Sequence, residues 1–283
     1  VIIGVMAVVA LLSIGRGSEK AITSNIESMG TNLLFIASGT TTDEGVKQAL
    51  GTAQTLTFED ADVIIAQVPS VAAVAPETST AVQVVAGRLN VRTSLIGVTP
   101  EYESVRNFAV AEGEFISFSD LQTRAAIVVL GSSVATTLFP DSNPLGQTVM
   151  INNSPLEVIG VLASKGSTAT GFLDDQILAP LTTVQARFSA EITSTGEHIV
   201  RIINVQVKSA EETDTAIQQI SDLLRERHRI TGDTPDDFII TNQQDVIAAL
   251  QKTTQVWVIF LGVIAGISLL VGGIGIMNIM LVS

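Results

Sequence analysis

A long run without a charged residue at the C-terminal end limits the possible folds more than any other feature. It extends from Val256 to Val282 and reads VWVIFLGVIAGISLLVGGIGIMNIMLV. A helix needs about 20 apolar residues to cross the hydrocarbon core of a membrane, and at about 1.5 Å per residue this run would reach roughly 40 Å. The alternative is a buried helix of a large soluble core, but such helices rarely stay uncharged over this length. We therefore predict a transmembrane helix over residues 256–283.

Small and aromatic residues within this run indicate how the helix would be placed. Trp257 opens the run, where its amphipathic ring would sit at the level of the lipid headgroups and act as a membrane-interface anchor. Glycines let membrane helices approach closely, so we predict a packing surface at five of them. These are Gly262, Gly266, Gly272, Gly273 and Gly275. The last three also look like half of a dinucleotide fingerprint, but their place in an uncharged run favours helix packing.

The N-terminus carries a second, shorter apolar run. It extends from Val1 to Gly15 and is followed by Arg16. A signal-peptide core is the alternative interpretation, but no basic residues precede the run and GRGSEK is a poor cleavage site. We therefore expect residues 1–15 to be the end of a first transmembrane helix, in a fragment that begins inside one membrane helix and ends inside another.

The region between the two runs contains nearly all of the charge. The chain has 15 Lys and Arg against 28 Asp and Glu, a net charge of −13, and 46% hydrophobic residues. This balance excludes a disordered acidic tail and disfavours a nucleic-acid binder, which needs a surplus of basic residues. The absence of cysteine removes disulfides and thiolate metal sites, and 4% aromatic residues argue against a sugar-binding cleft.

Apolar residues at helical spacing flank both membrane runs. Ile22 and Ile26 follow the first run, and Val246 and Leu250 precede the second, after a capping box at Thr241-x-x-Gln244. We expect both membrane helices to continue outward as stalks, in residues 16–80 and 242–255. The register would pair Ile22 with Leu250 and Ile26 with Val246. Two ordinary short helices that bend at the membrane are the alternative.

Further in, the pattern predicts an α+β fold with two β-α-β units around a β-rich insert. The first unit, within residues 16–80, has strands over 33–37 and 71–75 and a helix over 57–68 that Thr57 would cap. The second, within residues 191–241, has strands over 202–208 and 238–241 and a helix over 211–230. The insert, residues 81–190, would contain strands over 82–85, 91–98, 126–130, 148–151 and 156–162, a hairpin at Asn152-Asn153-Ser154-Pro155, and a helix over 132–139.

No motif indicates an enzyme. The chain lacks the Gly-x-x-x-x-Gly-Lys-Ser/Thr phosphate loop and the Gly-x-Ser-x-Gly nucleophile elbow, and Lys165-Gly166-Ser167-Thr168 is best explained as a flexible loop. His198 and His228 are too far apart in the sequence to form a local metal pair, and Asp174-Asp175 fits a loop or a cap better than a catalytic pair. We therefore expect no catalytic residue, no cofactor and no metal.

Short matches along almost the whole chain resemble one family. The segment from Ile264 to Ser283, including Gly272-Gly273-Ile274-Gly275-Ile276-Met277-Asn278, resembles the start of the second transmembrane helix in MacB-type ABC transporter permeases, of the wider MacB/FtsX-like group. Further matches follow in order: Gly97-Val98-Thr99-Pro100-Glu101-Tyr102, Val105-Arg106-Asn107, Val129-Leu130-Gly131, Leu138-Phe139, Pro144-Leu145-Gly146-Gln147, Val158-Ile159-Gly160-Val161-Leu162, Lys165-Gly166, Pro180-Leu181-Thr182-Thr183 and Leu224-Arg225-x-Arg227-His228.

The resemblance implies an extracytoplasmic domain between the first two of four transmembrane helices, with a porter-like part of two β-α-β units and an inserted β-rich part. It implies a permease dimer, homo- or heteromeric, that works with a cytosolic ABC ATPase subunit or domain. Further partners that it allows are a periplasmic adaptor and an outer-membrane channel. The expected role is to transmit ATP-driven motion for export of peptides, antibiotics, other amphiphiles or a lipoprotein. The protein would lie in the inner cell membrane, in contact with lipid, with residues 16–255 outside the cytoplasm.

Two other functions fit the same layout. One is a two-span sensor receptor with an extracytoplasmic ligand-binding domain, which would continue beyond Ser283 into a signalling module. The other is a permease-like regulator of a cell-wall hydrolase, which would co-purify with the hydrolase instead of an outer-membrane channel.

Overall fold

The fold was analysed in a computed structural model, which describes residues 13, 15, 17, 32–39, 42–43, 46–47, 55–165, 167–168, 171–189, 192–193, 196–232 and 234–282. The chain divides into two units, one of Val1–Glu27 and Gln244–Ser283 and one of Ser28–Gln243. The two predicted β-α-β units and the β-rich insert all lie in the second unit, whereas the predicted C-terminal membrane helix lies in the first.

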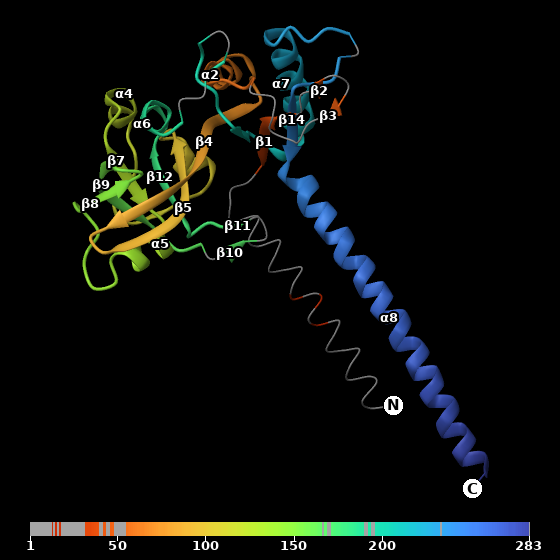
Figure 1. Cartoon of the computed structure of the whole chain (residues 1–283). Helices are drawn as coiled ribbons and strands as arrows, with labels where there is room; N and C mark the ends of the chain where they lie inside the picture. Colours follow the sequence, from red (N-terminus) through yellow and green to blue (C-terminus); the bar gives the residue numbers. More distant parts are fainter. Residues whose placement is uncertain are drawn as a thin grey trace. The chain divides into compact units, whose positions relative to one another are not determined.

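The two β-α-β units supply four neighbouring strands at one end of a ten-stranded sheet (Figure 1). The first consists of β1 (Leu33–Ser38), α2 (Phe58–Gln67) and β4 (Val71–Ala86), and the second of β13 (Ile202–Val207), α7 (Thr213–Arg227) and β14 (Phe238–Asn242). The strand order is β14-β1-β13-β4, and every neighbouring pair is antiparallel. Each unit therefore has a strand of the other unit between its own two strands, which is the split β-α-β arrangement of ferredoxin-like sheets.

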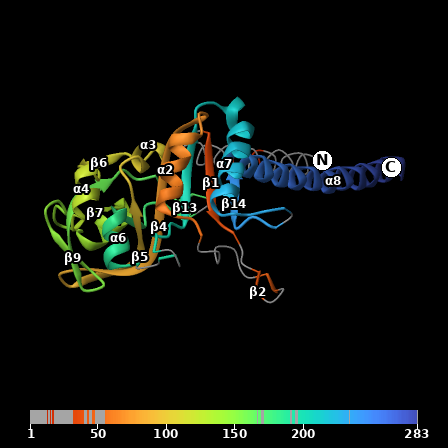
Figure 2. The ribbon, with the colours of Figure 1, turned by 90° about the horizontal axis from the view of Figure 1, so that it is seen from above.

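Alternation along the strands decides which face of this sheet each side chain covers. In β1, Leu34 and Ile36 belong to the core under α2 and α7, whereas Leu33 and Phe35 face a separate core on the other side. The two helices lie side by side over the first face (Figure 2). Ala61 and Ile64 of α2 and Ala216, Ile220 and Leu224 of α7 form their buried stripes. These residues recur at helical spacing along each helix.

β4 continues past these four strands into a small barrel. From Glu77 onward it pairs with β5 (Leu89–Val98), and the hydrogen-bonded path then runs through β12 (Gln176–Pro180), β7 (Ile127–Leu130), β9 (Ser154–Leu162) and β8 (Thr148–Ile151) back to β4. These strands therefore close into a ring, orange to green in Figure 1. The predicted boundary between residues 80 and 81 falls inside β4, so one strand belongs to both parts.

The barrel has its own apolar core and is bordered by short helices. α5 (Ser132–Leu138) contributes Val134, Ala135 and Leu138 to this core, and α6 (Leu181–Arg187) contributes Val184. The remaining described elements are α3 (Tyr102–Val105), α4 (Phe118–Thr123), β6 (Val110–Gly113), a 3-10 turn at Ala210–Glu212, and the two-residue strands β2 (Thr42–Asp43), β3 (Val46–Lys47), β10 (Ser167–Thr168) and β11 (Gly171–Phe172).

A 40-residue helix, α8, extends from Gln243 to Val282 and directly follows β14. The prediction of a capping box at Thr241 is wrong, because Thr241 and Asn242 still belong to β14, paired with Phe35 and Leu34. The strand therefore ends one residue later than predicted, and no linker separates it from the helix.

Most predicted elements are confirmed with small changes at their ends. Thr57 caps α2, and the β8–β9 hairpin turns at Asn152-Asn153, whose φ angles of 44° and 69° fit the turn expected there. Two predicted strands, over 71–75 and 82–85, are parts of the single strand β4. The structure confirms the mixed α and β composition of the fold.

Candidate functional site

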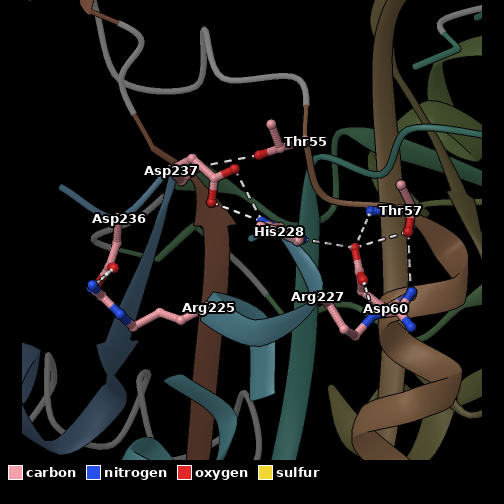
Figure 3. Close-up of polar contacts among 8 residues, drawn as sticks. All are labelled: Thr55, Thr57, Asp60, Arg225, Arg227, His228, Asp236 and Asp237. Carbon is pink, nitrogen blue, oxygen red and sulfur yellow. Dashed lines mark hydrogen bonds and ion pairs between the residues drawn. The ribbon is translucent and has the colours of Figure 1, made fainter. Parts of the chain in front are cut away.

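Four charged side chains from different elements meet at the point where the two β-α-β units join (Figure 3). Asp60 lies in the first turn of α2. Arg227 and His228 lie at the end of α7, and Asp237 directly precedes β14. The cluster thus joins the helix of the first unit to the helix and the last strand of the second. We call these four residues the ion cluster.

Local structure at the start of α2 fixes the position of Asp60. The Thr57 backbone N–H and hydroxyl both donate to Oδ2 of Asp60, each at 2.8 Å, and the Asp60 N–H donates to the Thr57 hydroxyl at 3.3 Å. This is a capping box, which satisfies backbone donors that the first turn of a helix leaves free. The carboxylate is therefore already oriented before it meets α7.

His228 bridges two carboxylates. Its Nδ1 lies 2.8 Å from Oδ1 of Asp237, and its Nε2 lies 3.3 Å from Oδ2 of Asp60. On the other side of Asp60, the Arg227 Nε donates to Oδ1 at 2.7 Å. The side chains of Asp60 and His228 are 2% and 9% exposed, so these contacts are largely shielded from water.

The surroundings determine the charge of these groups. Burial by itself would lower the pKa of His228, but the hydrogen bonds and charges of Asp237 and Asp60 outweigh it and raise that pKa from 6.5 to about 9. Burial by itself would raise the pKa of Asp60, but the bonds from His228, Arg227 and Thr57 outweigh it and lower that pKa from 3.8 to about 2. At neutral pH the cluster therefore holds a protonated imidazole beside an ionised Asp60.

Further bonds connect the ion cluster to β1 and to the strand from which α8 begins. The Gly39 N–H, at the end of β1, donates to the backbone oxygen of Asp237 at 2.7 Å. Nearby, Arg225 of α7 pairs with Asp236 (Figure 3). Since β14 begins at Phe238, the residues that hold Asp237 also hold the start of the strand that precedes α8 in the chain.

The arrangement suits a structural role better than catalysis. The Thr57 hydroxyl donates to Asp60, and a carboxylate with a pKa of about 2 is too weak a base to activate it as a nucleophile. In the described part of the chain, no group of three His, Cys, Asp or Glu residues is placed to hold a metal ion. The paired charges instead fix the positions of three elements.

α8 supplies the second functional feature. Among the described helices, it alone has the length and apolar composition that a membrane crossing requires; its stretch Gln243–Ile264 meets that requirement, and the apolar run continues to Val282. Its large apolar side chains are exposed: Val256, Trp257, Ile259, Phe260, Val263, Ile264, Ile267, Leu270, Val271, Ile274, Met277, Met280 and Leu281. Exposed apolar surface of this extent is typical of contact with lipid or with another helix.

The site residues predicted from the sequence lie along α8 or outside the described residues. Trp257 is 61% exposed. A Cβ built on Gly262, Gly266, Gly272, Gly273 or Gly275 would meet no atom within 4 Å, so their packing role stays a prediction. Val246 is half-buried in the first turns of α8, and Leu250 follows it one turn later. Ile22 and Ile26 lie outside the described residues, so the pairing of the stalks stays a prediction as well.

The sequence analysis missed the ion cluster. It treated His228 as an isolated histidine and as part of the Leu224-Arg225-x-Arg227-His228 match, and it did not single out Asp60 or Asp237. A signal did exist, because Asp60 stands three residues after the capping Thr57, where a capping box places an acidic side chain. The contact with His228 spans 168 positions, and no local pattern predicts it.

Comparisons with known proteins agree with this geometry. The family model described as MacB-like periplasmic core domain matches residues 1–223. The macrolide export ATP-binding/permease protein MacB of Azoarcus sp. (strain BH72) is 39% identical over 284 residues, which cover all of this chain and 41% of that protein. The protein of the same name from Rhodospirillum rubrum is 40% identical over 286 residues, with 100% and 42% covered. The chain thus spans about two fifths of the length of these curated relatives.

Solved structures show the same fold. The periplasmic region of MacB from Actinobacillus actinomycetemcomitans superposes with a TM-score of 0.65 and 24% identity, over 82% of this chain and 98% of that chain. The extracellular domain of the ABC-type transporter YknZ from Gram-positive bacteria gives a TM-score of 0.58 and 21% identity, over 75% and 100% of the two chains. These matches show the fold, and the family model and the relatives show that the chain belongs to the family of MacB-like ABC transporter permeases, of which it contains the periplasmic core domain.

Proposed function

We propose that the chain is part of the permease subunit of an ABC-type exporter and that its core domain receives motion from the membrane through α8. The observation that carries this proposal is the direct passage from β14 into α8, together with the ion cluster that holds Asp237 at the start of β14. A helix joined without a linker to a strand of a packed sheet transmits a shift to that sheet, whereas a flexible linker would absorb it.

Other subunits complete the proposed exporter. The relatives are named ATP-binding/permease proteins, and the phosphate-loop pattern does not occur in this chain, so we assign ATP hydrolysis to a separate ABC ATPase domain or subunit. A dimer of permeases, a periplasmic adaptor and an outer-membrane channel are the partners that the family resemblance implies. The cargo class is an antibiotic such as a macrolide, a peptide, another amphiphile or a lipoprotein.

The proposed location follows from α8. Its apolar part would lie in the inner membrane, in contact with lipid and packed on another helix through Gly262, Gly266, Gly272, Gly273 and Gly275. Residues 16–255 would lie outside the cytoplasm, with Trp257 at the interface. Pairing of Ile22 and Ile26 with Leu250 and Val246 would make the two stalks one rod.

Insertions into α8 test the proposal in the full-length transporter. Two inserts of equal length, about seven residues or roughly two helical turns, would be placed between Gln251 and Lys252, before the apolar run. An Ala/Glu/Lys insert continues the helix almost in phase, whereas a Gly/Ser insert is flexible. We expect macrolide export to stay within about threefold with the helical insert and to fall about tenfold or more with the flexible one.

Both variants would first be compared for amount in the membrane and for thermal unfolding. Equal export with the two inserts would show that a rigid connection is not required, and the proposed transmission would be wrong. Loss of export with both, at normal abundance, would point to a requirement for the length of α8 and would also contradict transmission by rigidity alone.

A further inference from the structure

A groove between α2 and α4 is not used by the function proposed above. It has a volume of about 250 Å³. Its lining residues come from α2, β4, the loop after β5 and α4, and include Asp62, Ile65, Glu101 and Phe118. We call this the α2–α4 groove.

Two large apolar side chains at this groove are exposed to solvent. Phe118, the first residue of α4, is 61% exposed, and Ile65 of α2 is 44% exposed. The described residues of Ser28–Gln243 contain four other large apolar side chains with comparable exposure, Leu89, Met150, Ile192 and Ile239, and none of them lines this groove. An exposed aromatic ring beside a concave apolar surface is typical of a protein-binding anchor point.

The charge of the groove has one sign. Asp62 and Glu101 line it, and the described lining residues include no Lys, Arg or His. Burial, and after it the negative charge of Glu101, raise the pKa of Asp62 above its ordinary value. A cation placed between them would relieve this repulsion.

We propose that the α2–α4 groove binds a segment of a partner protein in which an apolar side chain stands beside a lysine or arginine. The apolar side chain would fill the groove between Ile65 and Phe118, and the basic group would lie at Asp62 and Glu101. The size favours a protein segment over a free small molecule, because small-molecule pockets usually measure about 300–1,000 Å³ and this groove accommodates one or two side chains.

Defined peptides test the proposal without any transport assay, so failure here would leave the proposed function intact. The chain would be placed in nanodiscs of neutral phosphatidylcholine, and three short fluorescent peptides would be compared by anisotropy: alternating Phe and Lys, alternating Phe and Glu, and alternating Ser and Lys. We expect saturable binding of the Phe/Lys peptide and at least about tenfold weaker binding of the other two, since each lacks one half of the recognised chemistry.

Variants then locate the binding site. Phe118→Ala should weaken the Phe/Lys peptide about tenfold, as expected for loss of an aromatic anchor. Asp62→Asn with Glu101→Gln should weaken it several-fold at low ionic strength and remove most of its salt dependence. The matched controls are Leu89→Ala, at an exposed apolar residue outside the groove, and Asp141→Asn, at an exposed carboxylate; both should bind as the parent chain does.

Several outcomes would overturn the proposal. These are no saturable binding beyond that of empty nanodiscs, equal binding of the Phe/Lys and Phe/Glu peptides, or equal losses in Phe118→Ala and Leu89→Ala. A further one is saturation by the small amphiphile dodecyltrimethylammonium, dependent on Phe118, when the peptide does not bind. In that case the groove takes a small cationic amphiphile and not a partner protein. Phe118 is largely exposed, so its truncation leaves the fold intact, and thermal unfolding would check this.

Discussion

The imidazole of His228 lies between two carboxylates, and this makes the stability of the core domain depend on pH. Its pKa in the folded chain is about 9, above the ordinary value of 6.5. The stabilisation is therefore fully present below about pH 6.5 and is lost as the pH rises through 9. For Asp60 the direction is opposite: its pKa is about 2, below 3.8, so its stabilisation is present above about pH 4 and is lost as the pH falls through 2.

We expect the free energy of unfolding to fall on the order of 3 kcal/mol between pH 6 and pH 10 because of His228 alone. His228→Gln should remove most of this slope, whereas His198→Gln, at the other histidine, should keep it. Thermal unfolding of the purified chain across this range measures the effect. A slope that persists unchanged in His228→Gln would mean that other groups cause it.

Asp60 and Asp236, the acidic partners of Arg227 and Arg225, should contribute differently to the free energy of unfolding. Asp60 is 2% exposed and bonds both Arg227 and His228, whereas Asp236 is 33% exposed and pairs with Arg225. Removing one partner of a buried ion pair costs about 3–5 kcal/mol, and an exposed pair contributes about 0–1 kcal/mol. Asp60→Asn should therefore lower the stability by several kcal/mol and Asp236→Asn by less than about 1 kcal/mol. Similar losses in both variants would show that the ion cluster is not specially stabilising.

At the scale of the elements, amphipathic helices and strands with alternating polar and apolar residues could be predicted from the sequence. Short helices, and strands that are buried at every position, could not. α2 and α7 keep their buried stripes over several turns, so the sequence indicates them clearly. β12 is buried at all five positions and α6 begins directly after its last residue, Pro180, so neither shows a periodic pattern of its own. β4 was predicted as two strands, because Pro76 and the polar residues after it interrupt the apolar pattern where the strand passes from the sheet to the barrel.

The turn between β8 and β9 offers a test at this scale. Asn153 has a φ of 69°, in the left-handed region, which Gly adopts freely and β-branched residues avoid. Asn153→Gly should leave the stability unchanged or slightly higher, whereas Asn153→Val should lower it by about 1–2 kcal/mol. Unfolding by denaturant compares the two. Equal effects would indicate that the turn changes its conformation in the variants.

At the scale of the whole molecule, the family and the fold class could be predicted from the sequence, whereas the contacts between residues far apart in the chain could not. The family matches run along most of the chain and preserve their order, and the family model and the relatives confirm them. Nothing local, however, indicates that the two β-α-β units interleave, because the pairing of β1 with both β13 and β14 joins residues that are far apart in the chain. The ion cluster depends on the same pairing and was missed for the same reason.

Interleaved units with a shared ion cluster suggest that β14 moves together with the rest of the sheet and does not slide along it. β14 pairs with β1 over five positions, and Gly39 and His228 hold the residue that precedes it. Any motion that reaches the core domain by the proposed route through α8 would then displace it as a rigid body. A covalent lock between β1 and β14 distinguishes this from sliding, and these 283 residues contain no cysteine that would compete for it.

Ala37 and Ile239 are directly opposite each other in this strand pair, and Ile239 is 40% exposed. Antiparallel partners have Cα atoms about 4.5–5.5 Å apart, within the range that a disulfide spans. In the full-length transporter, Ala37→Cys with Ile239→Cys should form a disulfide on mild oxidation, and export should stay within about twofold of the reduced form. The two single variants, treated with the same oxidant, control for oxidation elsewhere. Export that is lost on oxidation and restored by reductant would show that β14 must slide against β1, and motion of the core domain as a rigid body would be wrong.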